Sequence, residues 1–149
     1  MSLEQKINDD IKTAMLAREK EKLEALRAIK SAVLLAKTEK AGAALDSDTE
    51  IKMLQKMVKQ RRESAEIYTS QGRTDMAEAE IFQAGIIEAY LPEQLSEDSI
   101  REIIKQIISE SGASGSKDMG KVMGLANQKL AGKADGKTVA AIVKALLGM

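Results

Sequence analysis

The sequence predicts an all-α protein, and three observations lead to that prediction. Apolar residues recur at steps of three and four along almost the whole chain, which is the spacing of one helix face. Helix-forming residues such as Ala, Glu, Lys, Leu, Gln and Met dominate, and the 149 residues include one proline. Strand-like alternation is nearly absent. We expect an N-terminal helical hairpin or bundle over residues 1–91 and a small three-helix domain over residues 96–149.

The first two helices are marked by regularly spaced apolar residues. The first series is Leu3, Ile7, Ile11 and Met15, and the second is Leu23, Leu26, Ile29 and Val33. Ser2 and Gln5 have the spacing of a capping box, in which each side chain satisfies the other residue's backbone N–H. Because glycine commonly follows the end of a helix, the second helix should end near Ala41-Gly42.

The third and fourth helices follow with similar signals. Ser47 and Glu50 should cap the third helix, and Gln71-Gly72 should end it. Arg61 stands where the apolar series of this helix calls for another apolar residue. That series is Ile51, Leu54, Val58, Ala65 and Tyr68. The fourth helix should follow Thr74 and contain Ile81, Phe82, Ile86, Tyr90 and Leu91.

The single proline separates the N-terminal part from the rest of the chain. A residue before proline is pushed out of the helical region, so residues 91–96 should form a link around Pro92, and Ser96 should cap the next helix. Three short apolar series follow. They are Ile100, Ile103, Ile104, Ile107 and Ile108, then Met119, Val122, Met123, Ala126 and Leu130, then Val139, Ile142, Val143 and Leu146.

Composition excludes several classes of site. The chain has no Cys and no His, so it lacks disulfides, a thiolate nucleophile and the commonest general base and metal ligand. Only Tyr68, Phe82 and Tyr90 are aromatic, which argues against stacking of single-stranded bases. We therefore expect no catalytic residue, no metal and no cofactor.

The N-terminal sequence and the hydropathy bear on the compartment. Glu4, Asp9 and Asp10 do not fit a secretory signal peptide, and no apolar run approaches the ~20 residues that span a bilayer. We expect a cytoplasmic protein without membrane contact.

Charge is balanced overall but not along the chain. Lys plus Arg and Asp plus Glu number 23 each, whereas residues 112–149 hold six basic and two acidic side chains. The candidate anion-binding residues are Lys117, Lys121, Lys133, Lys137 and Lys144. Lysines also solvate helices with no further role, and both interpretations stay open. A second basic cluster, Lys56, Lys59, Arg61 and Arg62, should be offset by Glu63 and by an Arg62–Glu66 pair one turn apart.

Two glycines are expected inside the second of the three short helices. Gly120 and Gly124 each cost about 1 kcal/mol there relative to Ala, which some close approach should offset. They permit either a tight helix crossing within the small domain or contact with a ligand or partner.

Residues 131–138 imitate a phosphate-binding loop. The motif requires a glycine where Ala131 stands, and it requires a preceding strand. We favour a helix end at Gly132 and an N-cap at Asp135, and we expect no nucleotide hydrolysis. Magnesium-dependent ATP binding that Lys137→Ala abolishes would contradict this.

Several of these segments resemble a known family. Residues 118–124 (DMGKVMG), 132–136 (GKADG), 59–64 (KQRRES) and 90–96 (YLPEQLS) look like the YqeY family, and residues 96–149 also resemble the tail of GatB, the B subunit of the tRNA-dependent amidotransferase. The resemblance implies a helical module that helps to hold tRNA, with the amidotransferase chemistry lying in other domains. Its family label is carbon–nitrogen ligase with glutamine as amido-N-donor, and we expect no such activity from this chain alone.

The expected function follows from the lysines and the resemblance together. We expect binding of tRNA or structured RNA, and not DNA, through Lys117, Lys121, Lys133, Lys137, Lys144, Gly120 and Gly124. The alternative is a protein-interaction module that docks on a synthetase, an amidotransferase or a ribosomal factor.

Overall fold

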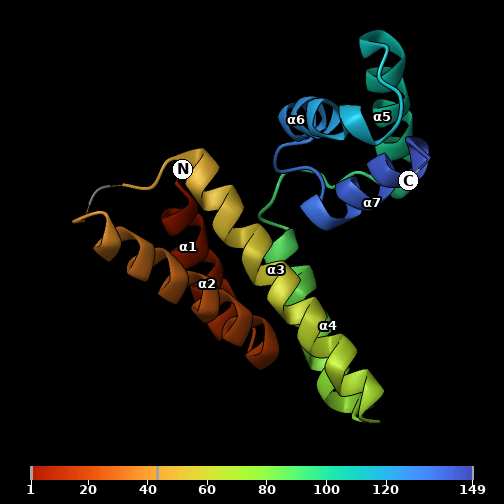
Figure 1. The fold of residues 1–149 in the computed structure, drawn as a ribbon. Coiled ribbons are helices and arrows are strands. Elements are labelled where there is room, and N and C mark those ends of the chain that lie inside the picture. The colour runs from red at the N-terminus through yellow and green to blue at the C-terminus, as the bar shows by residue number, and fades with distance from the viewer. Residues whose placement is uncertain (1, 43, 149) are drawn as a thin grey trace. The chain divides into compact units, whose positions relative to one another are not determined.

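A computed structural model describes residues 2–42 and 44–148. Within these residues it contains α-helices, one short 3-10 helix and no strand, so the predicted all-α fold is confirmed. The chain forms two compact units that divide between Leu91 and Pro92 (Figure 1). That residues 1–91 and 96–149 are domains able to fold independently stays a prediction.

Four helices make up the N-terminal unit, namely α1 (Leu3–Leu16), α2 (Lys20–Glu39), α3 (Ser47–Ser70) and α4 (Thr74–Glu88). α3 packs along α4, and α2 packs on both α1 and α4 (Figure 1). All four helices contribute to one core, whose largest fully buried side chains are Ile7, Leu26, Ile29, Leu54 and Ile87. Because burying one such side chain stabilises the fold by about 1.5–3 kcal/mol, these residues hold the unit together. Ile7, Leu26, Ile29 and Leu54 belong to the apolar series of the sequence, whereas Ile87 does not. Ile81 and Phe82, which the predicted α4 series includes, are 57% and 42% exposed.

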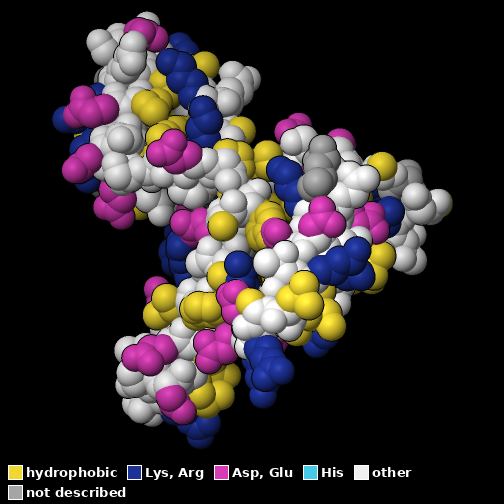
Figure 2. Space-filling view, turned by 180° about the vertical axis from the view of Figure 1, so that it is seen from behind, with side chains coloured by type: hydrophobic (Ala, Val, Ile, Leu, Met, Phe, Trp, Pro, Cys, Tyr) yellow, Lys and Arg dark blue, Asp and Glu magenta, His cyan; other side chains and the backbone are white. Residues whose placement is uncertain are grey.

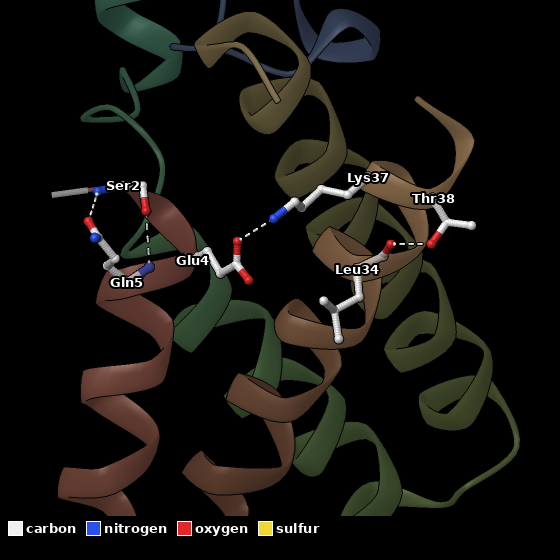
Figure 3. Close-up of polar contacts among 6 residues, drawn as sticks. All are labelled: Ser2, Glu4, Gln5, Leu34, Lys37 and Thr38. Carbon is white, nitrogen blue, oxygen red and sulfur yellow. Dashed lines mark hydrogen bonds and ion pairs between the residues drawn. The ribbon is translucent and has the colours of Figure 1, made fainter. Parts of the chain in front are cut away.

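The start of α1 is capped as the sequence predicts. The Ser2 hydroxyl accepts a hydrogen bond from the Gln5 backbone N–H, and the Gln5 side chain accepts one from the Ser2 N–H (Figure 3). Glu4, in the same first turn, forms a 2.9 Å ion pair with Lys37 of α2. A carboxylate is favoured at the positive N-terminal end of a helix, so Glu4 stabilises both the start of α1 and its packing on α2.

Two predicted helix ends in this unit are wrong. Asp46, and not Ser47, caps α3, and its carboxylate accepts a 2.7 Å hydrogen bond from the Thr49 N–H. Aspartate caps as well as serine and its charge suits the helix dipole, and its hydrogen bonds from Thr49 lower the pKa of Asp46. α4 ends at Glu88, so Tyr90 and Leu91 lie beyond the helix, where they still pack on the core.

Arg61 joins α3 to α4 at the point where the apolar series is interrupted. Its half-buried guanidinium donates through Nε to Gln83 Oε1 at 3.1 Å and through Nη1 to the Met57 carbonyl at 3.3 Å. Arg61 is therefore tolerated at a half-buried position between the two helices, because its Nε and Nη1 atoms both find hydrogen-bond acceptors there.

The C-terminal unit contains α5 (Glu97–Ser111), the 3-10 helix η1 (Ser116–Asp118), α6 (Met119–Lys129) and α7 (Gly136–Leu146), so the three predicted helices are confirmed. Ser96 caps α5 as predicted, and its hydroxyl accepts from the Ser99 N–H at 3.2 Å. The core between the three helices includes Ile104, Val122, Ala126, Val139 and Val143. Nowhere in residues 2–42 and 44–148 is there a helix with the length and apolar character that a membrane span requires.

The segment after Pro92 is fastened to the C-terminal unit. The Gln94 side-chain amide donates to the carbonyls of Pro92 at 2.8 Å and Gly132 at 2.7 Å. The Leu95 backbone N–H donates to the Lys133 carbonyl at 2.9 Å. These contacts fix the backbone of the loop between α6 and α7, in which Gly132 and Lys133 lie.

Candidate nucleic-acid interface

The seven candidate residues all lie exposed on the C-terminal unit. Lys117 is in η1 and Lys133 is in the loop after α6, while the others are on α6 (Gly120, Lys121, Gly124) and α7 (Lys137, Lys144). Figure 2 shows basic side chains following one another over part of this unit, next to hydrophobic ones. The structure leaves each of these ammonium groups accessible to a ligand.

The outer face of α6 carries Lys121 and Gly124. Val122 and Ala126 are fully buried, at 0% exposure. At about 100° per residue, Lys121 and Gly124 lie on the side of the helix turned away from them. α6 begins at Met119, so Lys117 belongs to the preceding turn.

The two glycines of α6 face open space. A Cβ added at Gly120 or at Gly124 meets nothing within 4 Å outside the backbone of α6 itself. A crossing helix would place atoms within that distance. The interpretation as a tight crossing inside the small domain is therefore wrong. Contact of these glycines with a ligand or partner stays a prediction.

The loop that imitates a phosphate-binding motif connects two helices. No strand precedes it in the described part of the chain. Gly132 has a φ of +75°, the left-handed conformation in which glycine typically ends a helix, as expected. Asp135 holds the N-cap position of α7, but its side chain makes no capping hydrogen bond. The predicted helix end at Gly132 is confirmed. Asp135 occupies the predicted N-cap position, but it does not cap the helix with its side chain.

The two basic side chains of α5 are paired, whereas the five candidate lysines are not, in the part of the chain that the structure describes. Arg101 and Asp98 approach to 3.6 Å, and Lys105 and Glu102 approach to 3.5 Å. Across the described residues, no acidic oxygen lies within 4.0 Å of any of the five candidate lysines. Because an unpaired ammonium keeps its full attraction for an anion, the surface formed after α5 is the more attractive one for phosphate.

Two features of this region escape sequence reasoning. The Asp118 carboxylate accepts a 2.8 Å hydrogen bond from the Ser114 N–H, which orders the turn that carries Lys117. The contacts of Gln94 and Leu95 with the α6–α7 loop join residues almost forty positions apart. No local sequence pattern predicts a contact at that separation. The Asp118 contact runs back four residues, so it is not the Asx turn that a local sequence pattern would predict. Among the described residues there is no group of three or more acidic side chains placed to hold a metal ion.

Comparison with known proteins finds similarity over most of the chain. The family model described as "Yqey-like protein" matches residues 4–147. A protein of Meyerozyma guilliermondii named "Altered inheritance of mitochondria protein 41, mitochondrial" is 36% identical over 109 residues, which cover 69% of this chain and 57% of that protein. A protein of the same name from Pyrenophora tritici-repentis is 26% identical over 147 residues, which cover 96% of this chain and 80% of that protein.

These matches bear on family and compartment. The chain spans little more than half the length of the first of these relatives. Both relatives are named as mitochondrial proteins, so the expected cytoplasmic location stays a prediction. The family model covers nearly all of the helices described above, in both units. The chain therefore belongs to the YqeY-like family.

Proposed function

We propose that the C-terminal unit binds the phosphates of tRNA or another structured RNA. The observation that carries the proposal is the set of exposed and unpaired lysines on η1, α6, α7 and the loop between them, in a segment whose charge is otherwise sparse. Lysine is a point charge that attracts phosphate without reading sequence. The lysines position an RNA electrostatically, and Gly120 and Gly124 give it access to the backbone of α6.

The chain acts as an accessory that holds RNA, and not as the catalyst. No His or Cys is present in its sequence, and the carbon–nitrogen ligase label of the family belongs in this view to proteins with a separate catalytic domain. A synthetase or an amidotransferase is the partner that would use an RNA held in this way.

Salt dependence tests the proposal. Each phosphate contact contributes about −0.7 to −0.9 to the slope of log K against log salt concentration. Replacing Lys121, Lys133 and Lys137 together by Gln should therefore flatten the slope for folded tRNA by about two to three. The control is Arg101→Gln with Lys105→Gln, which removes two basic groups that are already paired on α5. If the intact chain shows no salt-sensitive binding of tRNA near physiological ionic strength, the proposal is wrong.

One observation favours the alternative of a protein partner. Leu125 is 38% exposed, and it lies one turn after Lys121 on the same flank of α6. An exposed apolar side chain on a helix face suits docking of a partner helix. Leu125→Gln should then weaken capture of a synthetase or amidotransferase while it leaves the salt slope for tRNA unchanged, whereas the RNA proposal expects no such effect on protein capture.

A further inference from the structure

The middle of α3 is the most basic stretch of the N-terminal unit. Residues 51–62 contain five basic side chains and no acidic one, in a chain whose basic and acidic residues are equal in number. The sequence alone suggested that Glu63 and Glu66 neutralise this cluster. The structure distributes the five groups differently.

The two arginines of this stretch are engaged with α4. Arg62 forms an ion pair with Glu88, so the predicted Arg62–Glu66 pair is wrong. Arg61 donates to Gln83 and to the Met57 carbonyl. The reason is geometric, because α4 lies alongside this flank of α3 and offers partners more firmly placed than a side chain one turn along the same exposed helix. Both arginines serve the packing of the helix pair.

The three lysines of the stretch are left on the outside. We call Lys52, Lys56 and Lys59 the lysine stripe. All three are exposed, and in the described part of the chain none has an acidic oxygen within 4.0 Å. Their spacing of four and then three residues places them on one face of α3, opposite the buried Leu54 and Val58.

The stripe is long enough to meet several phosphates of one nucleic-acid strand. From Lys52 to Lys59 the helix axis advances about 10 Å at 1.5 Å per residue. One strand of double-stranded DNA presents a phosphate about every 3.4 Å of its axis, and at that spacing about three phosphates pass along the length of the stripe. Asp48 and Glu63 stand one turn beyond either end and limit the positive surface to these three residues.

We propose that the lysine stripe is a second phosphate-binding surface, which contacts the same RNA that the C-terminal unit holds. The inference rests on the proposed function, because it assigns a further contact to that ligand. It divides the basic residues of α3 by role: the arginines pack α3 on α4, and the lysines meet the RNA backbone. The second surface adds affinity without base recognition.

The test compares two triple variants of the full-length chain. Lys52→Gln, Lys56→Gln and Lys59→Gln together should flatten the salt slope of tRNA binding by about two to three. The control variant carries Lys6→Gln, Lys12→Gln and Lys20→Gln, which removes the same charge from exposed positions on α1 and at the start of α2, among acidic neighbours. The control should change the slope by less than one. Melting curves should be alike for the three proteins, which shows that the folds are intact.

The outcomes separate this inference from the proposed function. If the stripe variant and the control behave alike while the Lys121, Lys133 and Lys137 variant still flattens the slope, the stripe inference is overturned and the proposed function stands. If the intact chain has no salt-sensitive tRNA binding, both are overturned. If the stripe variant loses binding to vesicles of phosphatidylserine and phosphatidylcholine but not to tRNA, the stripe is a membrane contact and the inference is wrong.

Discussion

At the scale of single residues, Tyr90 ties the end of the N-terminal unit to its beginning. Its hydroxyl, just past the end of α4, donates a hydrogen bond to the Asp10 carboxylate on α1. Tyr90→Phe removes this bond and nothing else of the ring, so it should lower the free energy of unfolding by about 1 kcal/mol. Urea denaturation at pH 7 measures the change. A variant as stable as the parent would show that the bond contributes nothing.

The same bond makes the stability of the parent protein depend on pH in the alkaline range. Burial, the hydrogen bond to Asp10 and the charge of Asp10 raise the pKa of Tyr90 above its ordinary value of 10.0. A raised pKa means that the folded state holds the proton more tightly than the unfolded state. The contribution of Tyr90 to stability is therefore fully present below pH 10.0 and is lost as the pH rises beyond it. The stability difference between the parent and Tyr90→Phe should therefore be constant from pH 7 to 9 and shrink above pH 10.

For Arg61, the sequence predicts that the position is unusual but does not predict the hydrogen-bond partner. The interrupted apolar series singles out this residue, because helical periodicity is a local property of the chain. Its partner Gln83 lies on another helix, and the choice between an inward and an outward guanidinium depends on how closely α4 packs there. The Arg62–Glu66 prediction was wrong for the same reason, since a local spacing competed with a tertiary partner, Glu88.

At the scale of elements, the glycines of α6 yield the sharpest prediction. Gly124 lies within the helix, and an added Cβ there meets nothing within 4 Å. Gly124→Ala should therefore stabilise the chain by about 0.5–1 kcal/mol, because alanine is the better helix former and no clash offsets the gain. Thermal unfolding measures this, and a lowered melting temperature would mean that another group packs against the glycine.

The same variant carries a second readout. If RNA approaches the backbone of α6, the methyl group of Gly124→Ala should weaken tRNA binding even though the fold is more stable. Gly85 of α4 provides the control, since its Cβ position is equally open and it lies on the other unit. Gly85→Ala should stabilise the helix without changing tRNA binding.

The existence of every α-helix could be predicted, whereas their ends and environments could not. Apolar periodicity over ten or more residues is a strong signal, and it located all seven helices of the described chain. Asp46 and Ser47 are both good capping residues in adjacent positions, so only the backbone geometry decides between them. In the candidate site, the exposure of Lys121 follows from the helical wheel, but a glycine fits a crossing and an open face equally well until the neighbouring atoms are placed.

At the scale of the whole molecule, the link between the units should be the first point of proteolytic cleavage. Glu93 is exposed between the C-terminal end of the N-terminal unit and the anchored Gln94. A protease specific for glutamate should cut there before it cuts the exposed glutamates within helices, because folded helices resist cleavage. Mass spectrometry of early digests identifies the site. Trypsin should likewise cut early at Lys117, in the segment from Gly112 to Lys117.

The control is the same digestion in the presence of urea, where all sites should be cut alike. First cleavage inside α3 or α5, with residues 91–96 intact, would contradict the division of the chain into separable domains.

The anchors on either side of Pro92 have a consequence for affinity. Tyr90 is tied to α1, and Gln94 is tied to the loop after α6, so residues 91–93 are the span between the two anchors, about 10 Å when extended. If both proposed lysine surfaces bind one RNA, a short tether makes the second contact an intramolecular event, for which short flexible linkers give an effective concentration in the millimolar range. Under the proposal, neither surface then needs to bind tightly by itself.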